Sequence, residues 1–131
     1  MRFLILGATG FIGRHLTAFL IIEGHEVVAL ARDRTKLNIA SDALKVIQAT
    51  PTLSGNWQNE VARCDTVINL TGYPIMTRWS QKTKNLILST RIESTRNIVQ
   101  ALQDCSPKTF ICANAIGYYG NRGNELICLL Y

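Results

Sequence analysis

The sequence lacks the features of a membrane-spanning, disulfide-bonded or metal-binding chain. None of its apolar runs approaches the ~20 residues that are needed to cross a bilayer. Its four cysteines have no Cys-x-x-Cys spacing, which argues against zinc and favours thiols in a reducing compartment over disulfides. We therefore expect a cytoplasmic protein with no membrane contact and no metal ion.

The sequence also lacks a concentrated block of one charge. Fourteen lysines and arginines stand against nine aspartates and glutamates, and the basic residues are scattered without interleaved aromatics. Such scatter is typical of a solvated surface and argues against nucleic acid as a partner. With 47% apolar and 18% charged residues, the 131-residue chain has the composition of one globular domain. That length is short for an enzyme that also needs a substrate lobe.

The most informative stretch is Gly-Ala-Thr-Gly-Phe-Ile-Gly at residues 7–13. It lies between an apolar strand pattern at 3–6 and a helix pattern that ends at Gly24. A strand, a glycine-rich turn and a helix in this order are how many proteins hold a dinucleotide. The helix face expected to lie on the sheet is formed by Ile12, Leu16, Phe19 and Leu20.

Each glycine of this stretch has its own steric task. Gly7 lets the chain turn sharply off the strand, Gly10 leaves room for a pyrophosphate, and Gly13 lets the helix pack closely. The N–H groups and the dipole at the start of the helix favour negative phosphates, and Thr9 can add a hydroxyl donor. The spacing is one residue longer at the front than the common Rossmann fingerprint. The flanking strand and helix still favour a dinucleotide site over a chance loop.

The second strand pattern, Glu26–Ala31, ends at a basic residue. An acidic residue at that tip would bind the ribose 2′-hydroxyl of NAD(H). Arg32, followed by Arg34 and Lys36, instead predicts binding of a 2′-phosphate, and hence NADP(H) in preference to NAD(H). The plain alternative is a solvated loop arginine, because Asp33 lies beside it and can partly neutralise it.

Further strand patterns at 43–49, 65–70 and 108–113, and a long helix pattern from 80 to about 104, complete the chain. We predict an α/β fold, a Rossmann-like doubly wound parallel sheet of about five strands in the order 3-2-1-4-5, with helices on both faces. The sheet-facing stripe of the long helix is predicted to be Leu88, Ile92, Thr95, Val99 and Leu102.

In such a sheet the ligand lies at the carboxyl ends of the strands. Residues 69–72 lie at the end of the fourth strand and in the turn after it and should face the ribose and nicotinamide, although Gly72 alone can also be read as a turn residue. The predicted cofactor-binding residues are therefore Gly7, Thr9, Gly10, Phe11, Ile12, Gly13, Arg32, Asn69, Leu70, Thr71 and Gly72.

The chain resembles the extended short-chain dehydrogenase/reductase superfamily in its sequences at 7–13, 69–75 and 115–120, together with 78–79 and 89–95. The match is closest to the group named for nucleoside-diphosphate-sugar epimerases, whose bacterial members are called epimerase family proteins. This resemblance implies a nicotinamide cofactor, hydride transfer at a carbonyl or hydroxyl carbon, and proton transfer by a Tyr-x-x-x-Lys pair. In a full-length form it implies a small carbonyl compound or a nucleotide sugar as substrate.

The sequence departs from that pattern in ways that bear on catalysis. It contains no Tyr-x-x-x-Lys, since Tyr118 and Tyr119 are followed four residues later by Arg122 and Gly123. Asn114 stands where relatives usually have serine, and Tyr73 stands where they usually have glutamate. We therefore expect a single NAD(P)-binding Rossmann domain over residues 1–131, an N-terminal fragment without the substrate lobe and without catalytic residues.

Three functions fit these observations. The leading hypothesis is an NADP(H)-binding domain of an epimerase- or reductase-like protein, inactive in the absence of the proton relay. The first alternative is a non-catalytic module that senses a dinucleotide and signals through a protein partner. The second is an oxidoreductase that recruits Tyr119 or a residue of a second subunit. The apolar tail at 126–131 is read as a sixth strand or as a contact of a homodimer.

Overall fold

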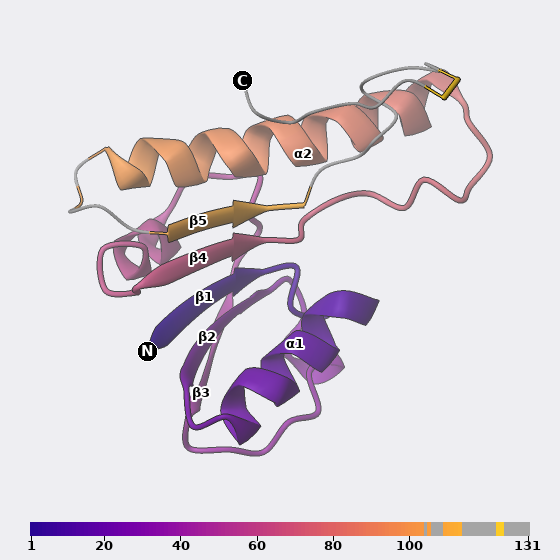
Figure 1. Cartoon of the computed structure of the whole chain (residues 1–131). Helices are drawn as coiled ribbons and strands as arrows, with labels where there is room; N and C mark the ends of the chain where they lie inside the picture. Colours follow the sequence, from indigo (N-terminus) through magenta and orange to yellow (C-terminus); the bar gives the residue numbers. More distant parts are fainter. Residues whose placement is uncertain (104, 106–108, 114–122, 125–131) are drawn as a thin grey trace.

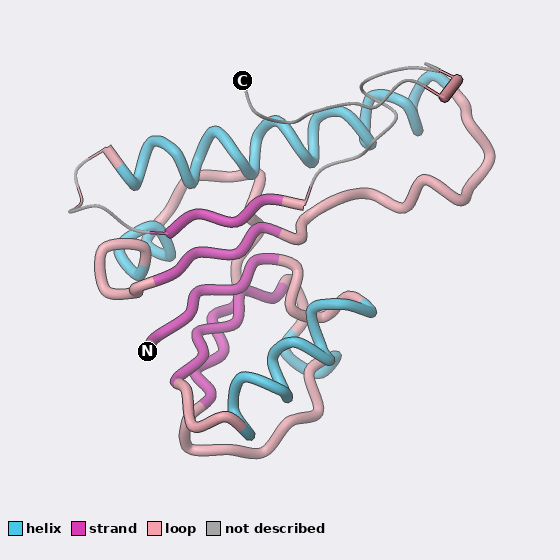
Figure 2. Tube along the Cα trace, in the orientation of Figure 1, coloured by secondary structure: helices cyan, strands magenta, loops and turns pink. Residues whose placement is uncertain are grey.

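The computed structural model describes residues 1–103, 105, 109–113 and 123–124 (Figures 1 and 2). The residues Asn114, Tyr118, Tyr119 and Arg122 and the apolar tail lie outside this part. The strands are β1 (Arg2–Leu6), β2 (Glu26–Ala31), β3 (Leu44–Gln48), β4 (Thr66–Asn69) and β5 (Thr109–Cys112). The helices are α1 (Phe11–Ile22) and α2 (Gln81–Leu102), with short 3-10 helices η1 (Arg34–Lys36) and η2 (Asn56–Glu60).

The five strands form one sheet in the order β3-β2-β1-β4-β5, and every neighbouring pair is parallel. The predicted strand order is confirmed. In the centre, Leu4 of β1 aligns with Val28 of β2 on one side and with Val67 of β4 on the other. Because all strands run the same way, their carboxyl ends meet at one edge and their amino ends at the opposite edge.

Helices cover both faces of the sheet, as predicted, with α1 on one side and α2 on the other (Figure 1). Alternate residues of β1 divide between two cores: Ile5 packs in the cluster with Leu20 of α1, and Leu4 in the cluster with Ile98 of α2. Leu4 and Ile5 are both fully buried. A central strand covered on both faces explains why the sequence of β1 is continuously apolar.

The predicted sheet-facing stripe of α1 is wrong at two positions. Ile12 and Phe19 are 63% and 56% exposed, whereas the buried residues of the helix are Gly13, Thr17 and Leu20. Gly13 must face the backbone of the preceding turn, and this contact sets the rotation of the helix. The inward face is therefore centred on a glycine and a threonine, which a count of apolar residues does not detect.

The predicted stripe of α2 is wrong at three of its five positions, for a related reason, whereas Leu102 packs against the core. Leu88, Ile92 and Val99 are exposed, and the buried residues of the helix are Ser94, Asn97 and Ile98. Asn97 Nδ2 donates to the carbonyl oxygen of Pro51 at 3.0 Å, and Ser94 Oγ accepts from an asparagine of β4. The inner face of α2 is thus partly polar, because its polar groups find partners on the sheet and its loops.

An ion cluster lies at the amino edge of the sheet. Glu60, 5% exposed, accepts from Lys45 Nζ at 2.8 Å, Arg2 Nη2 at 3.1 Å and Arg63 Nη1 at 3.3 Å. The hydrogen bond from Lys45, with the charges of all three cations, holds the pKa of Glu60 below its ordinary value despite burial. The backbone N–H of Arg2 also donates to the carboxylate of Asp65 at 2.7 Å, so ion pairs and hydrogen bonds to carboxylates link the elements at this edge.

Two negative findings apply to the described part of the chain. It holds no helix that combines the length and the apolar character needed to cross a membrane. It also holds no group of three or more histidines, cysteines or carboxylates that could bind a metal ion.

Candidate cofactor-binding cleft

The glycine turn after β1 packs directly on the chain that follows β4. Gly7 has a φ of +82°, in the left-handed region that favours glycine. A Cβ atom at Gly7 would lie 2.8 Å from the carbonyl carbon and oxygen of Leu70. Gly7 therefore serves the sharp turn, as predicted, and also the close approach of two strand ends.

The other two glycines shape the start of α1. A Cβ atom at Gly13 would overlap the carbonyl oxygen of Gly7 and lie 2.7 Å from Cα of Ala8, so the helix packs against the turn itself. Gly10 is the N-cap, and a Cβ atom there would meet one neighbour, the Gly7 oxygen at 3.3 Å. Gly10 N–H donates to that same oxygen at 3.0 Å. The turn is thus closed by backbone contacts.

The first turn of α1 leaves donors without partners inside the helix. The helical bonds begin with Arg14 N–H, which donates to the carbonyl of Gly10 at 3.0 Å. The N–H groups of Phe11, Ile12 and Gly13 precede that bond, as at the start of any α-helix. Such groups, with the positive end of the helix dipole, attract anions.

A cleft of about 250 Å³ opens at the carboxyl edge of the sheet beside this turn. Its walls come from the turn after β1, the end of β2, and the segments that follow β3 and β4, with one residue of α2. The lining residues are Gly7, Thr9, Gly10, Leu30, Arg32, Thr50, Pro51, Thr52, Leu70, Thr71, Gly72, Tyr73, Pro74 and Thr90.

The cleft brings together most of the residues predicted from the sequence. Those that line it are Gly7, Thr9, Gly10, Arg32, Leu70, Thr71 and Gly72. Phe11, Ile12, Gly13 and Asn69 are not in the lining: the first two side chains are exposed on α1, and Gly13 faces the turn. In their predicted role, these four residues would have to bind the cofactor through backbone groups or hold the residues that line the cleft in place.

The side chain of Asn69, at the end of β4, links three parts of the structure by hydrogen bonds. Asn69 is 2% exposed, and its Nδ2 lies 3.2 Å from both Ser94 Oγ and Thr95 Oγ1 of α2. Its Oδ1 accepts from the N–H of Thr71 at 3.1 Å. The asparagine thus joins β4, α2 and the cleft wall. Thr71 Oγ1 is buried and has no hydrogen-bond partner within the described part of the chain.

Arg32 stands exposed at the tip of β2, and no ion pair engages it among the described residues. The neighbouring carboxylate of Asp33 instead accepts from Thr35 N at 3.0 Å and Thr35 Oγ1 at 2.7 Å. The side-chain hydrogen bond from Thr35 is the main cause that lowers the pKa of Asp33 below its ordinary value. Asp33 is thereby held as the cap of η1.

A sequence model of the NAD-dependent epimerase/dehydratase family matches residues 3–127. The chain belongs to this family. Among curated members, it is 38% identical to the epimerase family protein YfhF of Bacillus subtilis over 125 residues, which cover 92% of this chain and 39% of YfhF. It is 34% identical to the chloroplastic SDR39U1 homolog of Arabidopsis thaliana, over 88% of this chain and 35% of that protein.

Solved structures of similar proteins share the fold. The human epimerase family protein SDR39U1, crystallised with NADPH, has a TM-score of 0.64 at 26% identity, over 91% of this chain and 38% of its own. MoeE5, in complex with UDP-glucose and NAD, has a TM-score of 0.78 at 26% identity, over 97% of this chain and 40% of its own. The chain therefore spans well under half the length of each of these similar proteins.

Within this epimerase-family cleft, the structure adds residues that the sequence reasoning missed. Thr50, Pro51 and Thr52 follow β3, so the rule that ligands lie at strand carboxyl ends could have found them. Tyr73 was noted in the sequence as a departure from the family and is part of the lining. Thr90 comes from the middle of α2, and no local sequence signal links it to the cleft.

Proposed function

We propose that this chain is the NADP(H)-binding domain of an epimerase- or reductase-like protein. The observation that carries the proposal is the cleft at the carboxyl edge, where the start of α1, the bare backbone of Gly10 and the guanidinium-bearing tip of β2 adjoin. The glycine turn, together with an arginine and a buried Thr71 hydroxyl that have no side-chain partner among the described residues, fits an extended, anionic ligand.

The pyrophosphate is assigned to the turn after β1. Backbone N–H groups of Phe11, Ile12 and Gly13 would bind its oxygens together with the N-terminal dipole of α1. Gly7 and Gly10 would let the phosphates approach, and the Thr9 hydroxyl would add a donor. Because these contacts are mostly to main chain, the exposed side chains of Phe11 and Ile12 are compatible with the role.

The 2′-phosphate is assigned to Arg32. Its planar guanidinium can hold a phosphate with two parallel hydrogen bonds, and Asp33 is engaged by Thr35. Similar proteins have been crystallised with NADPH and with NAD, so similarity alone does not choose between the cofactors. The charge at the tip of β2 is the feature that favours NADP(H) here.

The central ribose and the nicotinamide are assigned to residues 69–72. Leu70, Thr71 and Gly72 would contact the ligand from the wall of the cleft, and Asn69 would hold that wall in place. When bound, the nicotinamide supplies hydride transfer. The residues of this chain bind and orient the cofactor, and the sequence holds no Tyr-x-x-x-Lys to move the proton.

The remaining parts of the proposal concern the whole protein. We infer a single cofactor-binding domain over residues 1–131 and a cytoplasmic location, with a nucleotide sugar or a small carbonyl compound as the substrate of a longer form. The similarity to MoeE5, which was crystallised with UDP-glucose, supports the nucleotide sugar. Pairing into a homodimer is the expected oligomeric state, to be tested by sedimentation.

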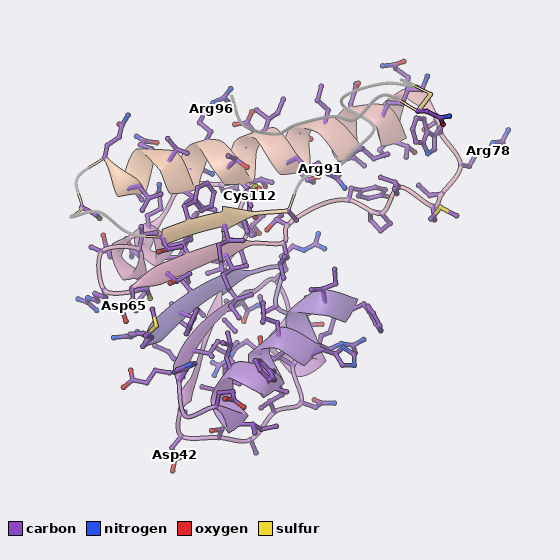
Figure 3. All side chains as sticks on the ribbon, viewed as in Figure 1. Asp42, Asp65, Arg78, Arg91, Arg96 and Cys112 are labelled. Atoms are coloured by element: carbon purple, nitrogen blue, oxygen red, sulfur yellow. The ribbon has the colours of Figure 1, made fainter. Side chains whose placement is uncertain are left out.

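Calorimetric titration of the purified chain with NADPH and with NADH tests the proposal. We expect NADPH to bind at least about tenfold more tightly, and Arg32→Gln to remove that difference while NADH affinity stays the same. Arg78→Gln, an exposed arginine far from the cleft, is the matched control (Figure 3). Absence of NADPH binding at millimolar concentration, or tighter binding of NADH, would refute the proposal.

A further inference from the structure

Two adjacent residues of α2 hold one residue of the cleft wall. The N–H of Tyr73 donates to Thr90 Oγ1 at 3.0 Å, and Arg91 Nη1 donates to the carbonyl oxygen of Tyr73 at 3.3 Å. Both polar backbone groups of Tyr73 are therefore fixed by the same turn of the helix.

The hydroxyl of Thr90 is oriented for this contact. It donates to the carbonyl oxygen of Leu86 at 2.7 Å, one turn earlier in α2, which leaves its lone pairs free to accept from Tyr73. A serine at this position could keep both bonds. A valine, nearly equal in shape, could make neither and would leave the Tyr73 N–H without its partner.

Arg91 completes the clamp from the other side. Its Nη1 also donates to the carbonyl of Ile87 at 3.0 Å, and its guanidinium lies over Gly72, where a Cβ atom would be 2.9 Å from Cζ. Figure 3 shows Arg91 between α2 and the chain that leaves β4. The absence of a side chain at Gly72 is thus what lets the guanidinium reach the backbone of the wall.

This clamp acts on a segment that has little other support. Residues 70–80 connect β4 to α2 without a helix or strand, and residues 74–80 are exposed. Tyr73 is half-buried and gives the cleft an aromatic ring, which can pack on a flat ring of a ligand. Without the two contacts from α2, the backbone of Tyr73 would lose both of these hydrogen bonds, whereas Asn69 would still hold Thr71.

We propose that Tyr73 contacts the nicotinamide half of the bound dinucleotide and that Thr90 and Arg91 are its positioning residues. The inference rests on the proposed NADP(H) function and extends it to a residue pair in α2. It predicts that the clamp affects the nicotinamide half of the ligand and leaves the adenosine half unaffected.

The test compares two ligands by calorimetry: NADPH and adenosine 2′,5′-bisphosphate, which lacks the nicotinamide half. Thr90→Val should weaken NADPH binding about fivefold, with bisphosphate binding unchanged, and Thr90→Ser should restore the NADPH affinity. Ser89→Ala is the matched control, because its exposed hydroxyl faces the same Leu86 carbonyl at 3.5 Å without touching the wall. It should change neither affinity.

A double-mutant cycle separates the clamp from a general loss of structure. Tyr73→Ala should also weaken NADPH selectively, and Tyr73→Ala combined with Thr90→Val should be no weaker than Tyr73→Ala alone. If Thr90→Val does not fold, as judged by circular dichroism, Arg91→Gln takes its place in the same cycle.

The outcomes distinguish this inference from the proposed function. If the unaltered chain binds neither ligand, the NADP(H) function is wrong and the clamp has no ligand to serve. If it binds both, but Thr90→Val leaves NADPH affinity unchanged or weakens both ligands equally, the positioning role is overturned. Additive losses in the double variant would equally overturn action through Tyr73.

Discussion

The two edges of this sheet use their polar groups in opposite ways. At the amino edge, Glu60 receives three basic side chains and Asp65 receives the backbone N–H of Arg2, so most donors and acceptors are paired within the described part of the chain, with the buried Nε of Arg2 as an exception. At the carboxyl edge, the first N–H groups of α1, the guanidinium of Arg32 and the hydroxyl of Thr71 lack such partners among the described residues.

This difference separates stability from binding within one sheet. Groups paired inside the protein stabilise the fold and are unavailable to a ligand, whereas unpaired groups at a concave edge can exchange water for a ligand. Parallel topology produces the separation, since every strand starts at one edge and ends at the other. Substitutions at the amino edge should change unfolding, and those at the carboxyl edge should change binding.

Gly7→Ala, although at the carboxyl edge, should have the largest effect on unfolding and is therefore an exception to that rule. The new Cβ atom would collide with Leu70 in a left-handed backbone, so we expect a loss of about 3 kcal/mol in the free energy of unfolding. Gly24→Ala is the matched control, with a φ of +79° and nothing within 4 Å, and should lose about 1 kcal/mol. Urea unfolding measures both. Equal losses would mean that the contact with Leu70 contributes nothing.

Glu60→Gln tests the amino edge directly. Removing the charge leaves three cations without their counter-charge and with one acceptor oxygen fewer, but their side chains are 31%, 52% and 63% exposed, and water screens them. We therefore expect a loss of about 1.5 kcal/mol in urea unfolding, less than for a fully buried pair. Glu93→Gln, which removes an exposed pair with Arg96, should lose less than about 0.5 kcal/mol. If the folded Glu60→Gln protein had a changed affinity for NADPH, the amino edge would affect binding as well as stability, contrary to this prediction.

Lowering the pH should destabilise the amino edge, because protonation of Glu60 removes the charge that pairs with the three basic side chains. Because the folded pKa of Glu60 lies below the ordinary value of 4.5, its contribution is fully present above that value. It is lost as the pH falls through the lowered folded pKa. The free energy of unfolding of the unaltered chain, measured with urea, should therefore fall more steeply below this pH than that of Glu60→Gln, by less than roughly 1 kcal/mol. Parallel pH profiles of the two proteins would contradict the assignment.

Arg32→Gln should have the smallest effect on folding. The side chain is exposed and makes no ion pair within the described residues, so its free energy of unfolding should stay within about 0.5 kcal/mol of the original. The same variant should lose its preference for NADPH. A clear loss of stability would show that Arg32 also serves the fold.

The sequence was sufficient for the sheet and insufficient for its helix faces. The central strands were predicted correctly because alternate residues such as Leu4 and Ile5 are buried on opposite faces of the sheet and form a continuous apolar run. The inner faces of α1 and α2 were misread because Gly13, Thr17 and Ser94 lie where apolar residues were expected. Their burial depends on partners remote in the sequence, which periodicity cannot reveal.

The candidate cleft was predictable to the extent that it follows strand ends. Thr50–Thr52 could have been found from the end of the third strand, while Thr90 could not, because its link to Tyr73 crosses seventeen positions of the sequence. The reverse holds for Asn69, which was expected to face the ligand and instead braces the wall. Supporting and contacting roles look alike in a sequence.

Three residues of the cleft lining, Gly7, Gly10 and Gly72, offer a ligand nothing but main chain. Peptide groups are the same in every protein, so a surface made of them can survive extensive divergence of the surrounding side chains. Mutational freedom should therefore be broad at positions such as Phe11 and Ile12, whose exposed side chains take no part in these contacts. Few substitutions should be tolerated at those glycines where a side chain would collide with the backbone, and at Asn69, whose hydrogen bonds fix the path of the chain.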